Sequence, residues 1–243
     1  MTYGQGVELR VAGAADVEAA VAVWQASLGG RGLRPNATRI AQVTLAISAP
    51  DALVVMAHDD GVAVGMALGE PGREQGGAGD LVPDLLHLSM LYVVPGAQRA
   101  GLGGALVEGI ADAAWARGAR RVSCWTPVGD APIGGLLAAC GLERSGRVRG
   151  SAEHWTAELE APVRNVVVTA DGIRLGQLLK LAGLVDTGSQ AKELLAAGEV
   201  QVDGEVDVRR GRQLLDGQVV TARDQAVRLV LDGPEPQPES RQP

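Results

Sequence analysis

A glycine-rich turn joins an apolar strand to a helix between residues 91 and 106. Gly101 and Gly103 allow the backbone to approach a ligand closely, and the first N–H groups of a helix have no acceptor within the helix. The positive end of the helix dipole strengthens their attraction for an anion. The segment is therefore a candidate phosphate site, although such a turn also occurs where a helix and a strand simply pack closely.

Two familiar phosphate-binding turns do not match this segment. A Walker-type loop requires Gly-Lys-Ser/Thr after the glycines, and none follows here. A dinucleotide site requires G-x-G-x-x-G at the first strand of its domain, and these glycines are spaced differently. The turn must therefore be interpreted from the wider pattern around it.

That wider pattern, V-x-P-x-x-Q-x-x-G-x-G, is intact at Val93, Pro95, Gln98, Gly101 and Gly103. It resembles the signature of the GNAT acetyltransferases, and the resemblance spans roughly residues 7 to 160. The resemblance implies an N-acetyltransferase that moves an acetyl group from acetyl-CoA to an amine acceptor without a metal.

The resemblance also implies which residues contact acetyl-CoA. Leu91, Tyr92 and Val93 would present backbone groups to its pantetheine arm. Main-chain amides after the strand would hold its pyrophosphate, and Arg99 would add a positive charge. These amides belong to Gln98, Arg99, Ala100, Gly101, Leu102, Gly103 and Gly104, and Asp130 is a further candidate residue for binding acetyl-CoA.

A histidine lies where many members of this family carry a catalytic Glu. His87 precedes Gln98 by eleven residues, and an imidazole, with a reference pKa of about 6.5, accepts a proton at neutral pH. The alternative is a half-buried strand residue without a catalytic role. Ser89 is expected on the same side of the strand, where it could hold a water, and Tyr92 on the opposite side, packed in the core. Asp84 is a weaker candidate.

The second half of the family pattern departs at the position of a Tyr that helps the thiolate leave. Members commonly carry Asn, then this Tyr, then Gly-Phe, whereas this chain has Asp130, Leu137 and Gly141-Leu142. Leu137 cannot donate a proton. The sequence leaves two hypotheses: an enzyme that relies on proximity and on amides that polarise the carbonyl, or an RNA-binding regulator whose first domain binds acyl-CoA without turnover. We favour the enzyme.

The remaining cysteines and histidines are expected to be structural. Cys124 and Cys140 lie in apolar segments without a His/Cys cluster, which indicates reduced core thiols rather than a disulfide framework or a metal site. His58 and His154 are expected at the surface of strands.

A second set of candidate residues begins at Ile173. One amphipathic helix ends at Gly183, another runs over 187–195, and an alternating hairpin with an Asp-Gly turn covers 198–206, followed by a strand near 217–221. This order resembles the S4 RNA-binding domain over Arg164 to about Leu231, with Gly176 where that family usually has Asp. The resemblance implies structured RNA or a ribonucleoprotein as partner. The candidate contacts are Arg174, Lys180, Ser189, Gln190, Lys192, Arg209, Arg210 and Arg212.

The charges of this second region are balanced but grouped. Residues 163 to 231 hold nine Lys or Arg and nine Asp or Glu. Both lysines of the chain fall on its two helices, and three arginines lie between 209 and 212. Such cations neutralise phosphates and give salt-sensitive, weakly sequence-selective binding. A solvated charged face is the alternative interpretation.

The elements that must position these residues form an α/β (α+β) pattern: a GNAT-like mixed sheet with flanking helices, then a small α+β domain. Helices are expected after Asp16 and Asn36, over 101–117 and over 133–140. Strands are expected over 52–57 and 62–68, which flank an Asp-Gly turn, and over 85–94, 122–126 and 154–159. The glycine-rich stretch 69–83 is expected to be a loop.

Composition limits the possible functions of the chain and its possible location in the cell. The chain has 243 residues and a net charge of −7, which argues against coating nucleic acid by bulk electrostatics. Its apolar runs are shorter than the roughly 18 residues of a membrane span, and its start does not resemble a secretory signal, so we expect a cytoplasmic protein without membrane contact. We expect domains at 1–161 and 173–231, a linker at 162–172 and a disordered tail at 232–243.

Overall fold

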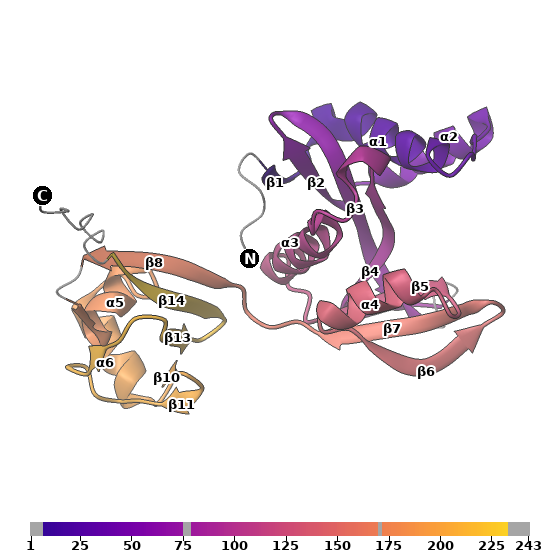
Figure 1. The fold of residues 1–243 in the computed structure, drawn as a ribbon. Helices are drawn as coiled ribbons and strands as arrows, with labels where there is room; N and C mark the ends of the chain where they lie inside the picture. Colours follow the sequence, from indigo (N-terminus) through magenta and orange to yellow (C-terminus); the bar gives the residue numbers. More distant parts are fainter. Residues whose placement is uncertain (1–6, 75–78, 170–171, 233–243) are drawn as a thin grey trace, which may run out of the picture. The chain divides into compact units, whose positions relative to one another are not determined.

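The computed structural model describes residues 7–74, 79–169 and 172–232. The chain divides into two compact units, Met1–Glu160 and Ala161–Pro243, and each has its own sheet and core (Figure 1). This agrees with the predicted fold class. No helix within the described ranges is long and apolar enough to cross a membrane.

The first unit is built on a seven-stranded sheet with the strand order β1-β2-β3-β4-β5-β7-β6. Only β4 and β5 run parallel, and every other neighbouring pair is antiparallel. The strands are β1 (Val7–Val11), β2 (Leu53–Asp59), β3 (Val62–Arg73), β4 (Leu81–Val93), β5 (Arg121–Pro127), β6 (Glu143–Arg149) and β7 (Ala152–Glu158).

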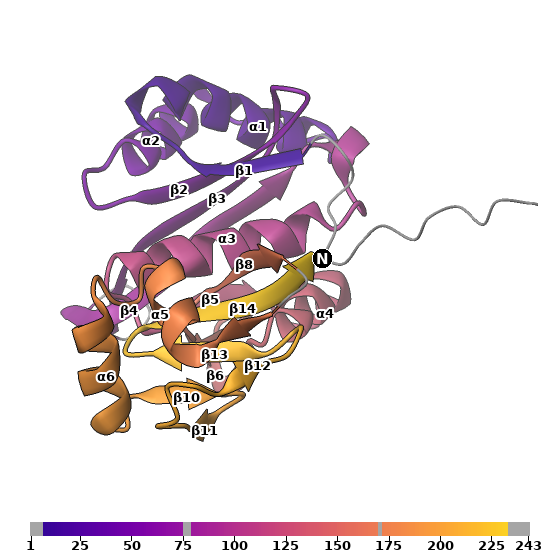
Figure 2. The same ribbon diagram turned by 90° about the vertical axis from the view of Figure 1, so that its left-hand side faces the viewer.

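Helices cover both faces of this sheet. On one face, Trp24 of α1 packs with Met56 and Met66, and on the other, Leu106 and Ile110 of α3 belong to a second apolar cluster. Figure 2 shows α1 and α2 on one side of β2 and β3 and α3 on the other. The helices are α1 (Val17–Gly29), α2 (Ala37–Ile47), α3 (Leu102–Ala116) and α4 (Ala131–Ala139), with short 3-10 turns η1 (Ala14–Asp16) and η3 (Pro95–Ala97).

Local turn and cap chemistry formed largely as expected. Asp60 and Gly61 both have positive φ, 47° and 80°, in the turn between β2 and β3, as a two-residue hairpin of this twist requires. The Asn36 side chain accepts from the Arg39 N–H at 2.8 Å and caps α2. Asp16, however, does not cap α1: its carboxylate accepts from the Gly13 N–H at 2.8 Å and pairs with Arg10.

Two parts of the sheet differ from expectation. The loop expected over 69–83 is shorter, because β3 continues to Arg73 and pairs with Leu81 at the start of β4; residues 75–78 lie outside the described residues. Strand β6 was not predicted from the pattern, since all seven of its residues are exposed and lack apolar alternation. Each of these segments is stabilised by pairing with the next strand along the chain, β3 with β4 and β6 with β7, which local composition does not reveal.

The second unit joins two helices to a five-stranded sheet with the order β11-β10-β13-β14-β8. Leucines of both helices, including Leu178, Leu179 and Leu194, pack on Val200 and Val220 of this sheet. Thr187 begins the second helix by accepting from the Gln190 N–H at 3.2 Å. The elements are β8 (Val163–Thr169), β9 (Ile173–Arg174), α5 (Leu175–Leu181), α6 (Gly188–Ala196), β10 (Val200–Val202), β11 (Glu205–Val206), β12 (Gln213–Leu214), β13 (Val219–Ala222) and β14 (Gln225–Asp232).

Most residues of the expected linker belong to the second sheet. Within the range 162–172, Val163–Thr169 forms β8, which pairs in parallel with β14 from Ala226 to Asp232. Its partner lies about sixty residues further along the chain, so no local hairpin signal marks it. The expected tail begins at Asp232, the last residue of β14, and its other residues lie outside the described ranges.

Candidate functional site

The two parallel strands at the centre of the first sheet separate along their length. β4 and β5 are paired only from Leu85 to His87 and from Arg121 to Ser123. Beyond that point β4 stays paired with β3, and β5 stays paired with β7. A cleft of about 240 Å³ occupies the resulting wedge. It is lined by Arg31, Leu88, Ser89, Met90, Leu91, Tyr92, Cys124, Trp125, Thr126, Pro127, Asp130, Ile133 and Leu137.

A β-bulge in β4 lies just beyond the last shared pair. Gly69 pairs with Leu88 and Leu68 with Met90, so Ser89 is an extra residue, and its hydroxyl donates to the Leu68 carbonyl at 3.2 Å. A bulge bends its strand and interrupts the alternation of side chains. Tyr92 packs against the cluster of α1 as expected, but the bulge places it on the His87 face of β4, contrary to the predicted parity. For the same reason, Ser89 does not follow the regular alternation that was expected to place it on the same face as His87.

The glycine-rich turn follows β4 and leads into α3. Gly101 has φ 81° and stands at the helix N-terminus without a side-chain cap. Gln98 is turned back, because its side-chain amide donates to the Val93 carbonyl at 2.9 Å. Ala105 N–H makes a bond to Gly101 carbonyl at 3.1 Å, so the amides of the preceding three residues face out of the first turn.

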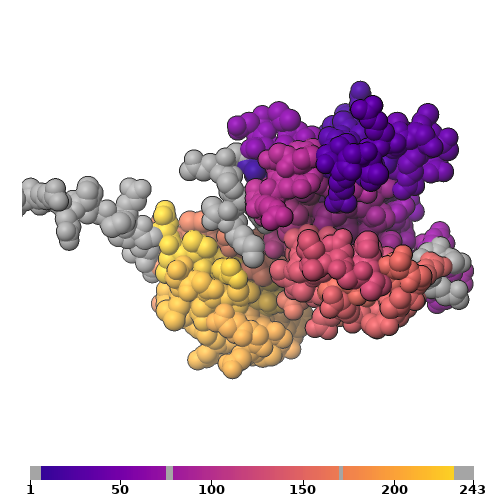
Figure 3. All heavy atoms as spheres, turned by 45° about the vertical axis from the view of Figure 1, so that its right-hand side comes forward, coloured from indigo at the N-terminus to yellow at the C-terminus, as the bar shows by residue number. Residues whose placement is uncertain are grey.

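Gly103 has a packing role in addition to any contact with a ligand. A Cβ at this position would lie 3.1 Å from Leu136 Cδ2 of α4, and Figure 3 shows the atoms of α3 and α4 against one another. Leu102 is buried. Of the residues predicted to bind pyrophosphate, Leu102 can therefore offer only its main-chain amide. The Gln98 N–H already donates to the Pro95 carbonyl at 3.4 Å, and the exposed Arg99 is the charged residue among them.

Asp130 is the N-cap residue of α4, and Leu137 lies within this helix. The Asp130 carboxylate accepts from the Ile133 N–H at 3.3 Å, which caps the helix where it borders the cleft. Leu137 is 1% exposed and belongs to the core. At the position of the family's Tyr, this chain therefore has a packed aliphatic side chain.

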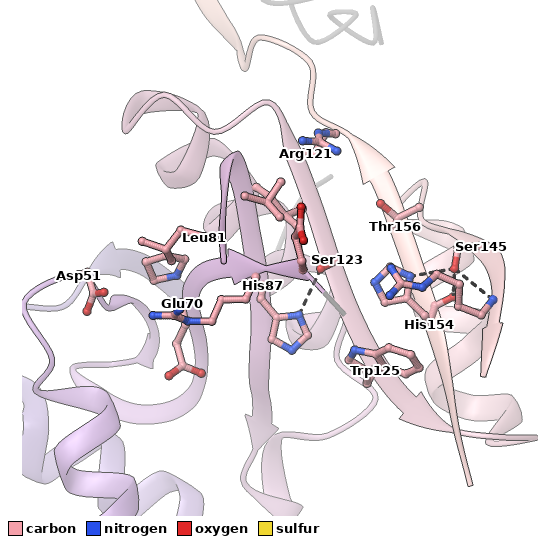
Figure 4. Close-up of a pocket in the computed structure, with 16 residues that line it drawn as sticks. Asp51, Glu70, Leu81, His87, Arg121, Ser123, Trp125, Ser145, His154 and Thr156 are labelled. Carbon is pink, nitrogen blue, oxygen red and sulfur yellow. Dashed lines mark hydrogen bonds between the residues drawn. The ribbon is translucent and has the colours of Figure 1, made fainter. Parts of the chain in front are cut away.

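A second cavity, of about 740 Å³, lies at the point where β4 and β5 are still joined (Figure 4). His87 and Ser123, the last shared pair, both line it, and Trp125 lines this cavity as well as the cleft. The cleft and the cavity therefore share Trp125 as a lining residue. The cavity's other residues include Asp51, Glu70, Arg73, Glu74, Arg121, Ser145, Arg147, His154 and Thr156.

His87 is held by its neighbour on β5. Its Nδ1 lies 3.2 Å from Ser123 Oγ. Burial lowers the pKa of His87 below its ordinary value, and the charge of Glu70 opposes that shift. The imidazole is consequently neutral at pH 7 and able to accept a proton. Asp84, the weaker candidate, pairs with Arg121 at 2.8 Å instead.

Two histidines expected at the surface are buried. His154 is 8% exposed; Ser145 Oγ lies 2.8 Å from its Nδ1, and its ring centroid lies 4.9 Å from that of Trp125. Its pKa is lowered mainly by burial and then by the charge of Arg147. His58 is 9% exposed and lies 3.5 Å from an Arg10 nitrogen. His58 lies on β2 and His154 on β7, and each of these strands is paired on both sides, so that residues of neighbouring strands bury the histidine. The sequence does not show this pairing.

Sequence reasoning missed most residues of the cavity, among them Glu70, Ser123, Trp125 and Ser145. Ser123 and Trp125 alternate along β5 and therefore share a face, a pattern visible in the sequence. Their meeting with His87 depends on the pairing of β4 with β5. The cysteines are free, as expected, and burial raises the pKa of Cys124 to about 12.

In the second unit, a buried carboxylate gathers two of the predicted arginines. Asp207 accepts from the Arg209 N–H at 2.8 Å, from Arg209 Nε at 3.1 Å and from an Arg212 guanidinium nitrogen at 2.6 Å. The Arg209 side chain, more than any other group, holds the pKa of Asp207 well below its usual range. The loop is tied to α5, since Leu175 N–H donates to Arg212 carbonyl at 2.8 Å.

The third arginine of the loop lies across the starts of both helices. A Cβ at Gly176 would lie 2.5 Å from Arg210 Cγ, and one at Gly188 would lie 3.1 Å from an Arg210 guanidinium nitrogen. An Asp at position 176, usual in the family, would displace Arg210. Gln190 Oε1 accepts from Asp186 and Thr187 N–H groups and serves as a cap. The remaining predicted contacts are all exposed: Arg174, Lys180, Ser189 and Lys192.

Comparison with known proteins agrees with these two units. The second unit is similar to two short proteins: "Probable ribosome maturation protein RlbA" of Bacillus subtilis (strain 168), 46% identical over 23% of this chain and 78% of that protein, and "Putative RNA-binding protein YbcJ" of Escherichia coli (strain K12), 40% identical over 24% and 83%.

The first unit is similar to solved structures at low identity. The GNAT domain of PAT from S. lividans is 17% identical, with a TM-score of 0.52 over 63% of this chain and 90% of that chain. A GNAT-family structure from Desulfovibrio desulfuricans is 18% identical, with a TM-score of 0.50 over 63% and 99%. At this identity the likeness shows the fold alone.

Two family models match the chain. The model of the S4 domain matches residues 166–230, and the model of the acetyltransferase (GNAT) family matches residues 19–142, about half of the chain. The chain therefore belongs to the GNAT acetyltransferase family and carries an S4 domain after its acetyltransferase domain.

Proposed function

We propose that the first unit transfers an acetyl group from acetyl-CoA to an amine. The observation that carries this proposal is that the cleft and the larger cavity share Trp125 as a lining residue, and that His87 and Ser123 line the cavity on the same strands. A donor in the cleft and an acceptor in the cavity would react beside an imidazole that is able to accept a proton.

The residues present fit acetyl-CoA. The cleft lies between strands that no longer bond to each other, so backbone groups of Leu91 and Tyr92, which line it, can bond to an extended chain such as pantetheine. The uncapped start of α3, with Gly101 at positive φ, supplies N–H donors for a diphosphate. Acetyl-CoA would supply an activated thioester carbonyl.

The residues beside Trp125 have separate roles in the proposed transfer. His87 Nε2 takes a proton from the acceptor amine while Ser123 holds Nδ1. Ser89, the bulged residue, lines the cleft beside them, and the main chain at a bulge has N–H groups outside the regular ladder that can polarise a carbonyl. Leu137 gives the departing thiolate no proton, so water or main-chain groups serve that purpose.

The S4 domain suggests where the acceptor is found. We propose that Arg209, Arg210 and Arg212 contact phosphates of a structured RNA, and that this contact brings the acetyltransferase to RNA or to a ribonucleoprotein. The names of the two relatives of this domain, one for ribosome maturation and one for RNA binding, support the proposal. An acceptor on such a particle would place the protein in the cytoplasm.

A regulator that binds acyl-CoA without turnover is the second candidate, and the buried Leu137 is the observation that favours it. The test measures two quantities on the full chain: calorimetric binding of acetyl-CoA, and release of free thiol with pooled amines. Binding with thiol release supports the enzyme, and binding without release for every amine supports the regulator. Absence of any binding heat contradicts both.

A further inference from the structure

Glu70 lies directly opposite His87 across β3 and β4. The two residues form a register pair, next to the bulge at Ser89, and cross-strand partners have Cβ atoms roughly 5 Å apart on the same face. Both side chains line the larger cavity, where Figure 4 shows Glu70 on one side of His87 and Trp125 and His154 on the other. The two groups are close enough for the charge of Glu70 to act on the His87 imidazole.

Glu70 is half-buried, yet no cation among the described residues holds its carboxylate. Within the described ranges it has neither a hydrogen bond nor an ion pair, whereas the arginines of the same cavity have other contacts. Arg121 pairs with Asp84 at 2.8 Å, and an Arg147 guanidinium lies 6.0 Å from the centre of the Trp125 ring. Arg73 donates to the Gly79 carbonyl at 3.4 Å. A half-buried carboxylate without a partner is a strong site for a cationic group.

We propose that Glu70 binds the ammonium group of the acceptor and so positions the acceptor nitrogen. This inference rests on the proposed acetyl transfer and names a residue that positions the acceptor for it. Alkylamines are protonated at neutral pH and enter as cations. Glu70 accepts hydrogen bonds from the ammonium and places its nitrogen beside His87.

The reaction balances with the groups present. One N–H proton of the ammonium passes to neutral His87, and the freed nitrogen lone pair attacks the thioester carbonyl carbon. A C–N bond forms, the C–S bond breaks, and the thiolate leaves with the bonding electron pair. A second nitrogen proton is released to solvent, so that the products are an amide, a thiolate that solvent protonates, and a proton on His87 that returns to solvent.

Two further carboxylates in the same cavity agree with a cationic acceptor. Asp51 and Glu74 line the cavity with Glu70, and in Figure 4 Asp51 lies on the same side of His87 as Glu70. A cation that approaches this side is attracted by several negative charges before it reaches Glu70. Glu74 also provides a matched control, since its removal changes the same charge in the same cavity.

The test uses the full chain without acetyl-CoA, so its result does not depend on turnover. The chain has three histidines, and their imidazole NMR signals are assigned with His58→Gln and His154→Gln. The probe is n-butylammonium chloride, and n-butanol is its neutral counterpart. We expect butylammonium to shift the His87 signals in a saturable way and butanol at equal concentration to leave them in place.

The variants decide between Glu70 and a general negative charge. Glu70→Gln keeps the shape of the side chain and is expected to raise the butylammonium midpoint about tenfold, an ordinary loss for a charge-assisted contact. Glu74→Gln is expected to stay within about twofold of wild type. Equal midpoints in wild type and Glu70→Gln overturn the inference, as do equal losses in both variants, shifts by butanol, or no shift by butylammonium.

The histidine pKa values of the ligand-free variant show whether Glu70→Gln disturbs the structure. Because the charge of Glu70 raises the His87 pKa, a folded Glu70→Gln protein shows that pKa lowered and the other two histidines unchanged. Thiol release with acetyl-CoA is measured separately. Loss of release with an intact butylammonium titration contradicts the proposed function and leaves the ammonium site in place, and the reverse result contradicts the site alone.

Discussion

Ser123 Oγ lies 3.2 Å from His87 Nδ1, at the last residue pair that β4 and β5 share. If Ser123 accepts from Nδ1–H, the lone pair of the imidazole is on Nε2, which is the nitrogen that a base must use. In that arrangement the contact sets the tautomer of His87, which lines the larger cavity together with Trp125, the residue that the cavity shares with the cleft.

Replacement of His87 tests its role as base. His87→Ala should lower kcat by about 10² to 10⁴, the usual contribution of general base catalysis, and should leave the Kd of acetyl-CoA nearly unchanged because His87 does not line the cleft. Thiol release and calorimetry measure the two quantities. His58→Ala, which removes an imidazole outside the cavity, is the control. Unchanged turnover in His87→Ala would remove this residue from the mechanism.

The pH dependence of kcat/KM tests the protonation state of His87. A base must be neutral, and its pKa lies below its ordinary value, so activity should rise with pH through an acid limb below about 6.5 and be level at neutral pH. The charged and titratable groups that line the cavity with His87 are Asp51, Glu70, Arg73, Glu74, Arg121, Arg147 and His154. Glu70→Gln should move the limb to lower pH. A limb well above 7 would contradict a buried neutral imidazole.

Replacement of Gly101 tests whether the turn before α3 binds the diphosphate of acetyl-CoA. Gly101→Ala forces a Cβ into a backbone with φ 81°, which costs about 1–2 kcal/mol, and shifts the first amides of α3. We expect weaker acetyl-CoA binding by calorimetry, together with a melting temperature lowered by a few degrees. Gly96→Ala is the matched control, because nothing lies within 4 Å of its Cβ position and its φ is not positive. Equal affinity in both variants would place the diphosphate elsewhere.

Arg210 tests the RNA surface. Arg210→Glu should weaken retention of structured RNA and lower the slope of log K against log salt by about 1, as expected when one phosphate contact is lost. Arg228→Glu makes the same charge change on β14, outside the arginine loop, and should have a smaller effect. Binding isotherms at several salt concentrations give both slopes. If the two variants behave alike, net charge and not the loop determines binding.

Asp207 tests how the arginine loop is held. Its folded pKa is far below that of an unfolded Asp, so its contribution to stability is present above about pH 4 and is lost as the pH falls through the folded value. Asp207→Asn should therefore lower the melting temperature of the S4 unit at pH 7, and the difference from wild type should narrow at acid pH. A difference that is constant with pH would mean that the carboxylate charge does not hold Arg209 and Arg212.

Local signals determined much of both units from the sequence alone. The Asp60-Gly61 turn, the Asn36 cap and the strand-turn-helix over 91–106 each rest on residues close in the chain, and so does the Asp203-Gly204 turn, where both residues have positive φ. Turn and cap preferences depend on a few neighbouring residues. The family and the place of His87 could therefore be predicted without coordinates.

Tertiary structure decided what surrounds those residues. The bulge at Ser89, the separation of β4 from β5, and the meeting of His87 with Glu70 and Ser123 all arise from strand pairing between distant segments. The parallel pairing of β8 with β14 and the burial of His154 have the same origin. Register between distant strands depends on the summed packing of a whole sheet and not on any local pattern, and for that reason only the fold showed the larger cavity and the place of Glu70 opposite His87.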